Sequence, residues 1–135
     1  MTTNVMSKIA VEQEVKALNG APVPIHLWGK DHWSTLAYAE CRVTDNSGTI
    51  NRQHMRGDAC GHDAGYPTRL RLGIELPNHS DFDCLFDFEA AGLMELTGTG
   101  LYPQIKKLTD RGKLVCAALR SHKQDGGSFS NFSYA

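Results

Sequence analysis

The sequence predicts an α+β fold with three or four helices and a small antiparallel sheet. Apolar residues recur at three- and four-residue steps in 31–43, 81–93 and 109–123, which is the spacing of amphipathic helices. Residues 70–76 instead alternate between apolar and polar or small side chains, as a half-buried strand does. A glycine-rich turn at 98–100 lies between the last two helices and predicts a hairpin there.

The first third of the chain contains one ambiguous segment and one clear helix. Residues 7–18 fit helical spacing with Asn19-Gly20 as the stop, yet Asn19-Gly20 would also suit a hairpin turn. Two prolines then force an extended passage, because proline neither continues a helix nor donates to a sheet. Asp31 is a good N-cap for a helix that runs to about Val43.

Residues typical of turns, loops and helix ends divide the rest of the chain into elements. The glycine-rich segment 57–66 predicts a surface loop. The alternation at 70–76 predicts either one strand or, with Gly73 at the tip, a tight hairpin. We expect the helix that follows to end at Ala90-Ala91-Gly92, and Thr109 to cap the last helix.

The apolar stripes of these elements predict the core. The expected core residues are Trp33, Leu36, Ile50, Leu72, Ile74, Phe82, Leu85, Phe86, Leu93, Ile105, Leu108, Leu114, Val115 and Leu119. Residues 1–123 are predicted to form one domain, followed by a tail, 124–135, that is flexible or docked. The tail carries three aromatic residues, which usually dock on a protein surface: Phe129, Phe132 and Tyr134.

Composition sets broad limits on function. The 135 residues are 41% hydrophobic and 21% charged, enough to bury a core without metal or disulfides. A formal net charge of −1 gives no global attraction to nucleic acid or membranes. Four widely spaced cysteines predict free thiols in a reducing compartment. With no apolar run long enough for a membrane span and no signal peptide, we expect a cytoplasmic protein.

The C-terminal half of the chain carries a specific order of elements. The run Leu85–Met94, the glycine-tipped hairpin and Leu108–Gly112 resemble the corresponding part of MarR- and PadR-like winged-helix regulators. In those proteins the helix before the hairpin is the recognition helix and the hairpin is the wing. The resemblance covers residues 81–123 and implies a winged-helix-like domain, for which pairing into a homodimer stays open. Residues 70–76 depart from it, because a winged helix has its second helix there.

Charge is divided between the two helices of this segment. The would-be recognition helix carries acidic residues that a phosphate backbone would repel: Asp81, Asp83 and Asp87. The wing and the last helix instead carry basic residues: Lys106, Lys107, Arg111, Lys113, Arg120 and Lys123. Such a division suits a protein partner or a self-complementary dimer better than a DNA groove.

We therefore expect a non-enzymatic binding module, an adaptor, regulator or inhibitor, that acts through a protein partner. Its interaction residues would be Asp81, Asp83, Asp87, Phe129, Phe132 and Tyr134. The alternative is a DNA-binding transcriptional regulator that uses the basic residues of the wing and last helix. A steep loss of DNA affinity with salt would distinguish the second from the first.

A third hypothesis is a small zinc- or thiol-dependent enzyme. The ligand-type residues that motivate it are Cys41, His54, Cys60 and His62. Cys60-Gly61-His62 has unusual ligand spacing, and no third group orients a Cys60–His54 nucleophilic pair. A second set of ligand types is better explained by a helix cap and by packing beside tryptophans: His26, Asp31, His32 and Asp63. No catalytic residue, metal site or cofactor is therefore predicted.

Overall fold

The structure is a computed structural model that describes residues 2–45, 67–77, 79, 81–96 and 106–134. Within these residues the chain forms four α-helices and two two-stranded antiparallel sheets, so the predicted α+β class is confirmed. The helices are α1 (Thr2–Leu18), α2 (Lys30–Asp45), α3 (Asp81–Ala90) and α4 (Asp110–Gln124). The strands are β1 (Thr68–Arg69), β2 (Glu75–Leu76), β3 (Met94–Leu96) and β4 (Lys106–Leu108).

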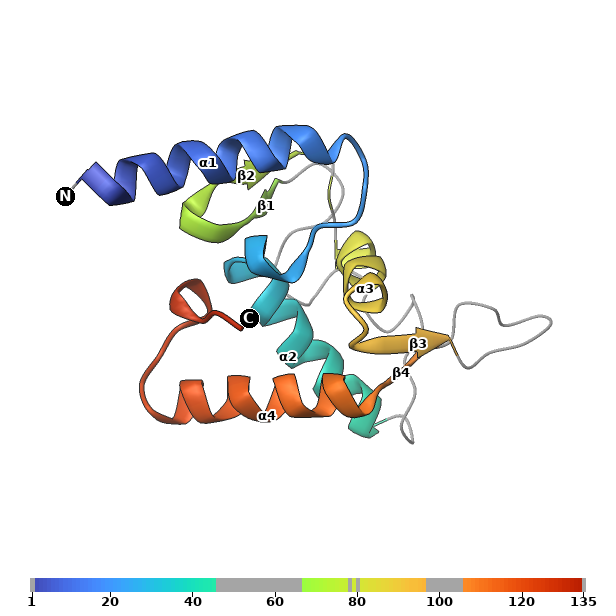
Figure 1. The fold of residues 1–135 in the computed structure, drawn as a ribbon. Coiled ribbons are helices and arrows are strands. Elements are labelled where there is room, and N and C mark those ends of the chain that lie inside the picture. Colours follow the sequence, from blue (N-terminus) through green and yellow to red (C-terminus); the bar gives the residue numbers. More distant parts are fainter. Residues whose placement is uncertain (1, 46–66, 78, 80, 97–105, 135) are drawn as a thin grey trace.

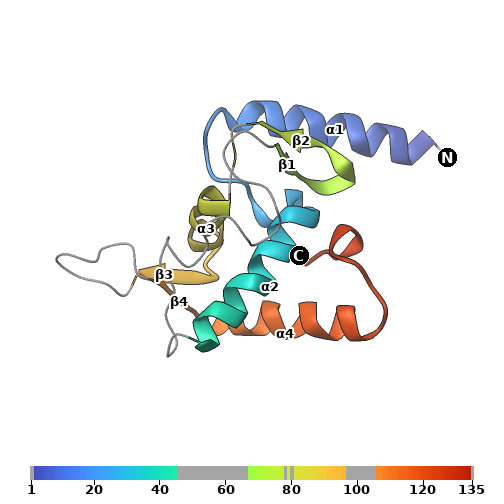
Figure 2. The same cartoon turned by 180° about the vertical axis from the view of Figure 1, so that it is seen from behind.

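Helix α2 is the centre of the fold. Figures 1 and 2 show it running through the middle of the molecule, with α1 and the β1–β2 hairpin on one side and α4 on the other. α2 also packs against α3 and against the C-terminal segment. Its Trp33, Leu36 and Ala39 side chains are fully buried and form the middle of the core. None of the helices in the described part of the chain is long and apolar enough to cross a membrane.

The segment before α2 is a helix and not half of a hairpin. α1 ends at Leu18, and Asn19 and Gly20 follow with φ of 45° and 87°, a left-handed exit from a helix. The helix alternative for this segment is thus confirmed and the hairpin alternative is wrong. The chain then passes through Val23 into a short 3-10 helix, Ile25–Leu27.

Residues 68–76 form a tight hairpin. Thr68 pairs with Leu76 and Arg69 with Glu75, and Gly73 has a φ of 77° in the turn between them. The hairpin alternative is therefore confirmed. Leu72 takes the turn position before Gly73, with a φ of 62°, and its side chain faces away from the core.

An ion pair between Arg69 and Asp31 connects the β1–β2 hairpin to the start of α2. The Asp31 carboxylate is fully buried and accepts hydrogen bonds from Arg69 N (2.6 Å), Nε (3.0 Å) and Nη2 (2.8 Å). The N-cap prediction for Asp31 is wrong, because the helix begins at Lys30 and the buried carboxylate binds Arg69 instead. Gly29 is required beside it, since a Cβ there would lie 2.2 Å from the Leu70 carbonyl carbon.

The helix–hairpin–helix order of the C-terminal half is present. α3 ends at Ala90 and the chain leaves it through Gly92, whose φ is 80°; β3 then pairs with β4 in antiparallel register with Met94 opposite Leu108. Thr109 caps α4 by accepting a hydrogen bond from the Gly112 N–H at 3.0 Å, as predicted. The predicted glycine turn at 98–100 lies outside the described residues.

The C-terminal segment packs back onto the fold. The Phe132 and Trp33 rings pack edge-to-face, with their centroids 4.7 Å apart, and the His122 ring centroid lies 5.0 Å from that of Phe132. His122 Nε2 is 2.7 Å from Asn131 Oδ1 and 2.8 Å from the Ser128 carbonyl, which holds the turn after α4 closed. Residues 125–134 thus cover one side of the central tryptophan.

The core prediction is partly correct. The predicted residues that are buried are Trp33, Leu36, Leu85, Leu93, Leu108, Val115 and Leu119. Leu72, Phe86 and Leu114 are 49%, 48% and 66% exposed, so their assignment to the core is wrong. Ile74 is half-buried, while Ile50, Ile105 and the side chain of Phe82 lie outside the described part. On α3 the core side chain is Phe88 in place of Phe86, because the helix turns a different face inward.

Candidate functional site

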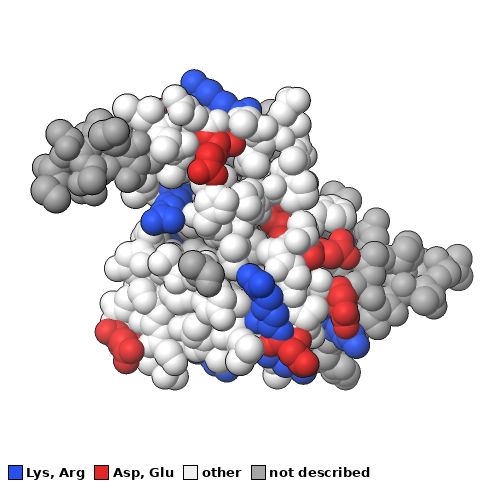
Figure 3. Space-filling model, viewed as in Figure 1, with Lys and Arg blue, Asp and Glu red and all other residues white. Residues whose placement is uncertain are grey.

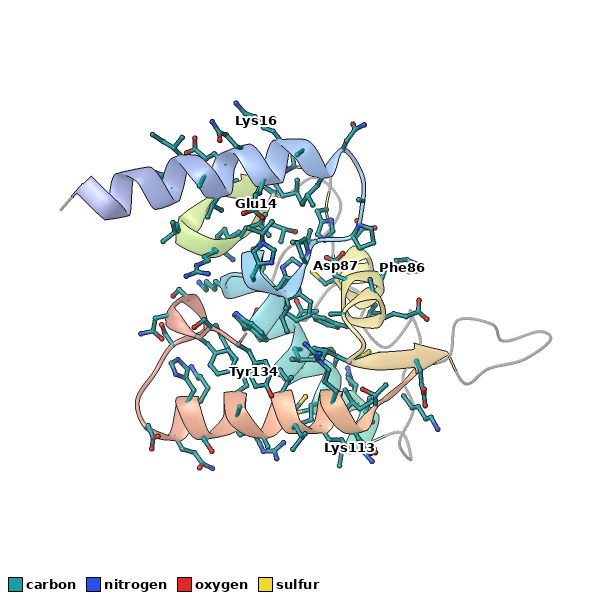
Figure 4. The ribbon with its side chains drawn as sticks, in the orientation of Figure 1. Glu14, Lys16, Phe86, Asp87, Lys113 and Tyr134 are labelled. Carbon is teal, nitrogen blue, oxygen red and sulfur yellow. The ribbon has the colours of Figure 1, made fainter. Side chains whose placement is uncertain are left out.

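The face that α3 buries contains an aspartate. Cys84, Leu85 and Phe88 are buried apolar side chains on this face, and Asp87 between them is only 1% exposed. Figure 4 shows Asp87 on the side of α3 toward α2 and Phe86 on the outer side. A carboxylate in such a position is stable only if hydrogen bonds or charges compensate its lost hydration.

Three donors supply that compensation. His32 Nε2 on α2 lies 2.7 Å from Asp87 Oδ2, and His79 Nε2, just before α3, lies 2.6 Å from the same oxygen. The backbone N–H of Val23 donates to Oδ1 at 2.9 Å. Asp87 therefore joins α3 to α2, to the segment before α3 and to the segment after α1.

The hydrogen bonds also determine the charge of the site. Burial raises the pKa of Asp87, but hydrogen bonds and positive charge from His32 and His79 lower it more strongly, so the net pKa lies below its ordinary value. The carboxyl group is thus ionised at neutral pH. An anionic oxygen is thereby held in the core between two imidazole rings.

Aromatic rings fix the orientation of His32. The His32 ring stacks on Trp28, with centroids 5.1 Å apart and planes 10° apart. Trp28 is itself held, because its Nε1–H donates to the Val23 carbonyl at 2.8 Å. The Phe88 ring lies nearly perpendicular to the His32 ring, at 75°, with the two ring centroids 6.3 Å apart. The imidazole is therefore preorganised to direct Nε2 at Asp87.

Cys84 completes a group of four side chains, which we call the buried cluster: His32, His79, Cys84 and Asp87. One nitrogen, sulfur or oxygen atom of each side chain lies within 4.8 Å of the corresponding atom of every other. Imidazole nitrogen, thiolate sulfur and carboxylate oxygen are the atoms with which proteins bind zinc. Among the described residues this is the one group with such a geometry.

The other described cysteines lie elsewhere. Cys41 is exposed on α2 and Cys116 is buried on α4. Burial, and secondarily the charge of Glu40, raises the pKa of Cys116 to about 12. Cys116 is therefore a thiol at physiological pH and has the chemistry of a packed apolar residue.

An open cleft of about 540 Å³ reaches the buried cluster from solvent. We call it the α1–α3 cleft, because the end of α1 and the outer part of α3 form its walls. Its apolar lining is Val15, Leu18, Ala21, Pro22, Leu76, Pro77 and Phe86. His79, Asp83 and Asp87 line it as well, so two members of the buried cluster face the cleft.

The predicted acidic interaction residues do not share one exposed surface. Asp83 lines the α1–α3 cleft, Asp87 is buried, and the side chain of Asp81 lies outside the described residues. The predicted tail aromatics also pack inward: Phe132 is buried, and Phe129 and Tyr134 are partly buried against the core. In this conformation Phe132 therefore contacts Trp33 and offers little surface to a partner.

The predicted basic residues are partly engaged within the chain. Lys107 pairs with Glu95 at 3.3 Å, Arg120 pairs with Glu40, and Lys123 Nζ lies 4.3 Å from the centre of the Phe129 ring. Arg111 and Lys113 are exposed at the start of α4, and the side chain of Lys106 is not described. On the face drawn in Figure 3, Lys and Arg side chains are interspersed with Asp and Glu.

Of the ligand-type residues considered from the sequence, the fold brings His32 into the buried cluster. Cys41 is exposed on α2, and His54, Cys60 and His62 lie outside the described residues. Sequence reasoning missed the buried cluster, although two signals were present. First, Cys84 and Asp87 are three residues apart on one helix, which places both side chains on one face. Second, His32 is a ligand-type residue at the start of a predicted helix, although packing beside tryptophan also explains it.

Comparisons with family models, with curated proteins and with solved structures find no match.

Proposed function

We propose that the protein is a non-enzymatic binding module on a winged-helix-like scaffold, and that it acts through a protein partner. The observation that carries the proposal is the α1–α3 cleft, which combines apolar side chains with charged residues from both walls, Lys16 of α1 and Asp83 of α3. Clefts of a few hundred Å³ with apolar walls and a few placed polar groups are typical binding sites. The order α3, β3, β4, α4 supports the scaffold assignment.

The lining indicates the chemistry of the partner. Phe86 is 48% exposed at the cleft and adds an aromatic ring of the kind enriched at protein interfaces. Asp83 supplies negative charge beside it. Lys16 of α1 lines the same cleft, so a polypeptide segment with an apolar side chain flanked by a basic and an acidic residue would complement this surface. The free thiols at Cys41, Cys84 and Cys116 are in keeping with a cytoplasmic location.

Photo-crosslinking in the producing cell tests this proposal. A photoreactive phenylalanine analogue is placed at Phe86 in one variant and at Leu114 in another. Leu114 is the matched control, because it is a 66% exposed apolar residue on α4, away from the cleft. We expect a defined protein adduct at position 86 that is absent at 114. The proposal would be contradicted if position 86 gave no discrete protein adduct that position 114 lacks. An adduct between two copies of this chain would identify the partner as a second copy.

DNA binding is the second candidate function. Two exposed basic residues, Arg111 and Lys113, lie in the first turns of α4 directly after β4, where they would neutralise phosphates of a bound duplex. Replacing both with alanine should make the slope of log affinity against log salt concentration shallower by about 1.8, the amount expected for two lost phosphate contacts. Absence of binding to random-sequence duplex at low salt would exclude this candidate.

A further inference from the structure

We propose that the buried cluster of His32, His79, Cys84 and Asp87 binds one zinc ion. This site is independent of the proposed protein-binding function, since it needs neither a partner nor the winged-helix assignment. It shares no residue with the ligand set Cys41, His54, Cys60 and His62, and shares His32 with the set His26, Asp31, His32 and Asp63.

The arrangement of atoms is the first argument. Both histidines direct Nε2 at Oδ2 of Asp87, at 2.7 and 2.6 Å, so three ligand atoms already converge on one point. In a tetrahedral zinc site with bonds of about 2.0–2.3 Å, neighbouring ligand atoms lie about 3.3–3.6 Å apart. The separations in the cluster, from 2.6 Å up to 4.8 Å, lie on both sides of this value. Small side-chain rotations therefore suffice to admit an ion.

The ligand set selects the metal. Two imidazole nitrogens, a thiolate and a carboxylate match zinc, which accepts nitrogen, sulfur and oxygen ligands in a tetrahedron. Calcium and magnesium prefer oxygen ligands throughout, so Cys84 and the two histidines disfavour them. The Cys84 thiolate and the Asp87 carboxylate together carry the charge that neutralises a divalent cation. The complex is then electrically neutral, which suits a core position.

Outer contacts hold the ligands in place. The Val23 N–H donates to Oδ1 of Asp87 at 2.9 Å, leaving Oδ2 to face the histidines. The stacking of His32 on Trp28 fixes the plane of that imidazole. Ligands in metal sites are generally oriented by such outer hydrogen bonds and packing. The Val23 N–H and the Trp28 ring thus orient two of the four ligands, Asp87 and His32.

The cluster is also accessible. Cys84 and His32 are fully buried, whereas His79 and Asp87 line the α1–α3 cleft. An ion can therefore enter from the cleft and meet His79 and Asp87 before the deeper ligands. On binding, Cys84 releases its thiol proton to solvent, and each imidazole also releases the Nε2 proton that it donates to Asp87, so that Nε2 binds the metal and a proton remains on Nδ1.

Cobalt(II) titration of the reduced, metal-free protein tests the proposal, because a cobalt–thiolate bond absorbs strongly in the near ultraviolet and tetrahedral cobalt absorbs in the visible. We compare the wild type with Cys84→Ser, Cys116→Ser and Cys60→Ser. Cys116 is the matched control, since it is a buried free cysteine on a different helix. Cys60 represents the alternative ligand set.

We expect the wild type to bind one equivalent of cobalt with both absorption features, and zinc to displace it and raise the melting temperature. The thiolate band should disappear in Cys84→Ser and persist in Cys116→Ser and Cys60→Ser. His32→Ala and His79→Ala should each lower zinc affinity at least tenfold. Absence of stoichiometric binding would overturn the proposal, and so would a thiolate band that depends on Cys60 and not on Cys84.

Discussion

Asp87 and His32 are 55 positions apart in sequence, and a 2.7 Å hydrogen bond in the core connects their side chains. This contact determines which face α3 presents to the rest of the fold. With Asp87 turned inward, Phe88 fills the core and Phe86 is left at the α1–α3 cleft. The same contact therefore shapes both the buried cluster and the proposed binding surface.

Replacing Asp87 with alanine should destabilise the metal-free protein by about 3–5 kcal/mol, because the donors from His32, His79 and Val23 lose their buried partner. Asp110→Ala is the control, since this aspartate is exposed in the first turn of α4, where its loss should cost about 0.3–1 kcal/mol. Urea unfolding of both variants measures the difference. Equal midpoints would show that the Asp87 hydrogen bonds do not stabilise the fold.

The Asp31–Arg69 ion pair should contribute to stability through the β1–β2 hairpin. Removing the guanidinium in Arg69→Ala leaves the buried Asp31 carboxylate with one backbone donor, and we expect a loss of about 1–2 kcal/mol because Arg69 is itself half exposed. Arg71→Ala is the matched control on the same hairpin, where the guanidinium makes a 3.3 Å hydrogen bond to the His26 carbonyl. Thermal unfolding should separate the two variants, and a larger effect for Arg71 would contradict this role of Asp31.

The C-terminal segment should shield Trp33 from water. Phe132→Ala removes the ring that packs edge-on against Trp33, and we expect a loss of about 3 kcal/mol with a red shift of tryptophan emission. Phe129→Ala should have a smaller effect on emission, since Phe129 is only partly buried. An unchanged emission spectrum in Phe132→Ala would mean that the segment does not pack on Trp33 in solution.

Thiol reactivity should distinguish the described cysteines. Cys41 is exposed and should be alkylated readily at pH 8. Cys116 is buried, and burial raises its pKa from the ordinary thiol value of 9.0 to about 12. This shift leaves about a thousandfold less thiolate at Cys116 than an unshifted thiol would have. Peptide mapping by mass spectrometry after brief alkylation measures the ratio. Fast labelling of Cys116 in the native protein would contradict its position in the core.

The raised pKa of Cys116 also has a consequence for stability. The native state holds the thiol proton more tightly than the unfolded state, so the contribution to stability is complete below about pH 9. It should be lost as the pH rises from 9 toward 12, because only the unfolded chain releases the proton readily. Cys116→Ala should flatten the alkaline decline in the free energy of unfolding, relative to Cys41→Ala.

Local patterns predicted the elements better than they predicted the site. The helix exit at Gly92, the Thr109 cap and the helices around Trp33 and Val115 follow from turn chemistry and apolar spacing, which are local properties. The exact rotation of α3 does not follow from local properties, because a charged residue such as Asp87 is expected to face solvent. Its inward position depends on His32 and His79, and only the folded chain brings those residues together.

The same reason explains the error at Asp31. A good N-cap residue just before an apolar helix predicts a cap, but the carboxylate instead binds Arg69, 38 positions away. Long-range partners of buried charges leave no periodic signal in a sequence. Asp31 and Asp87, the two aspartates predicted wrongly, are both buried charged side chains, and such partners explain their burial.

X-ray absorption at the zinc edge on the zinc-loaded protein tests the buried cluster most directly, because it identifies the ligands around the bound ion. We expect one sulfur at about 2.3 Å and three nitrogen or oxygen ligands at about 2.0–2.2 Å. The spectrum should show imidazole scattering, and the sulfur should be absent in Cys84→Ser. A spectrum without sulfur, or one that Cys84→Ser leaves unchanged, would show that His32, His79, Cys84 and Asp87 do not form a metal site.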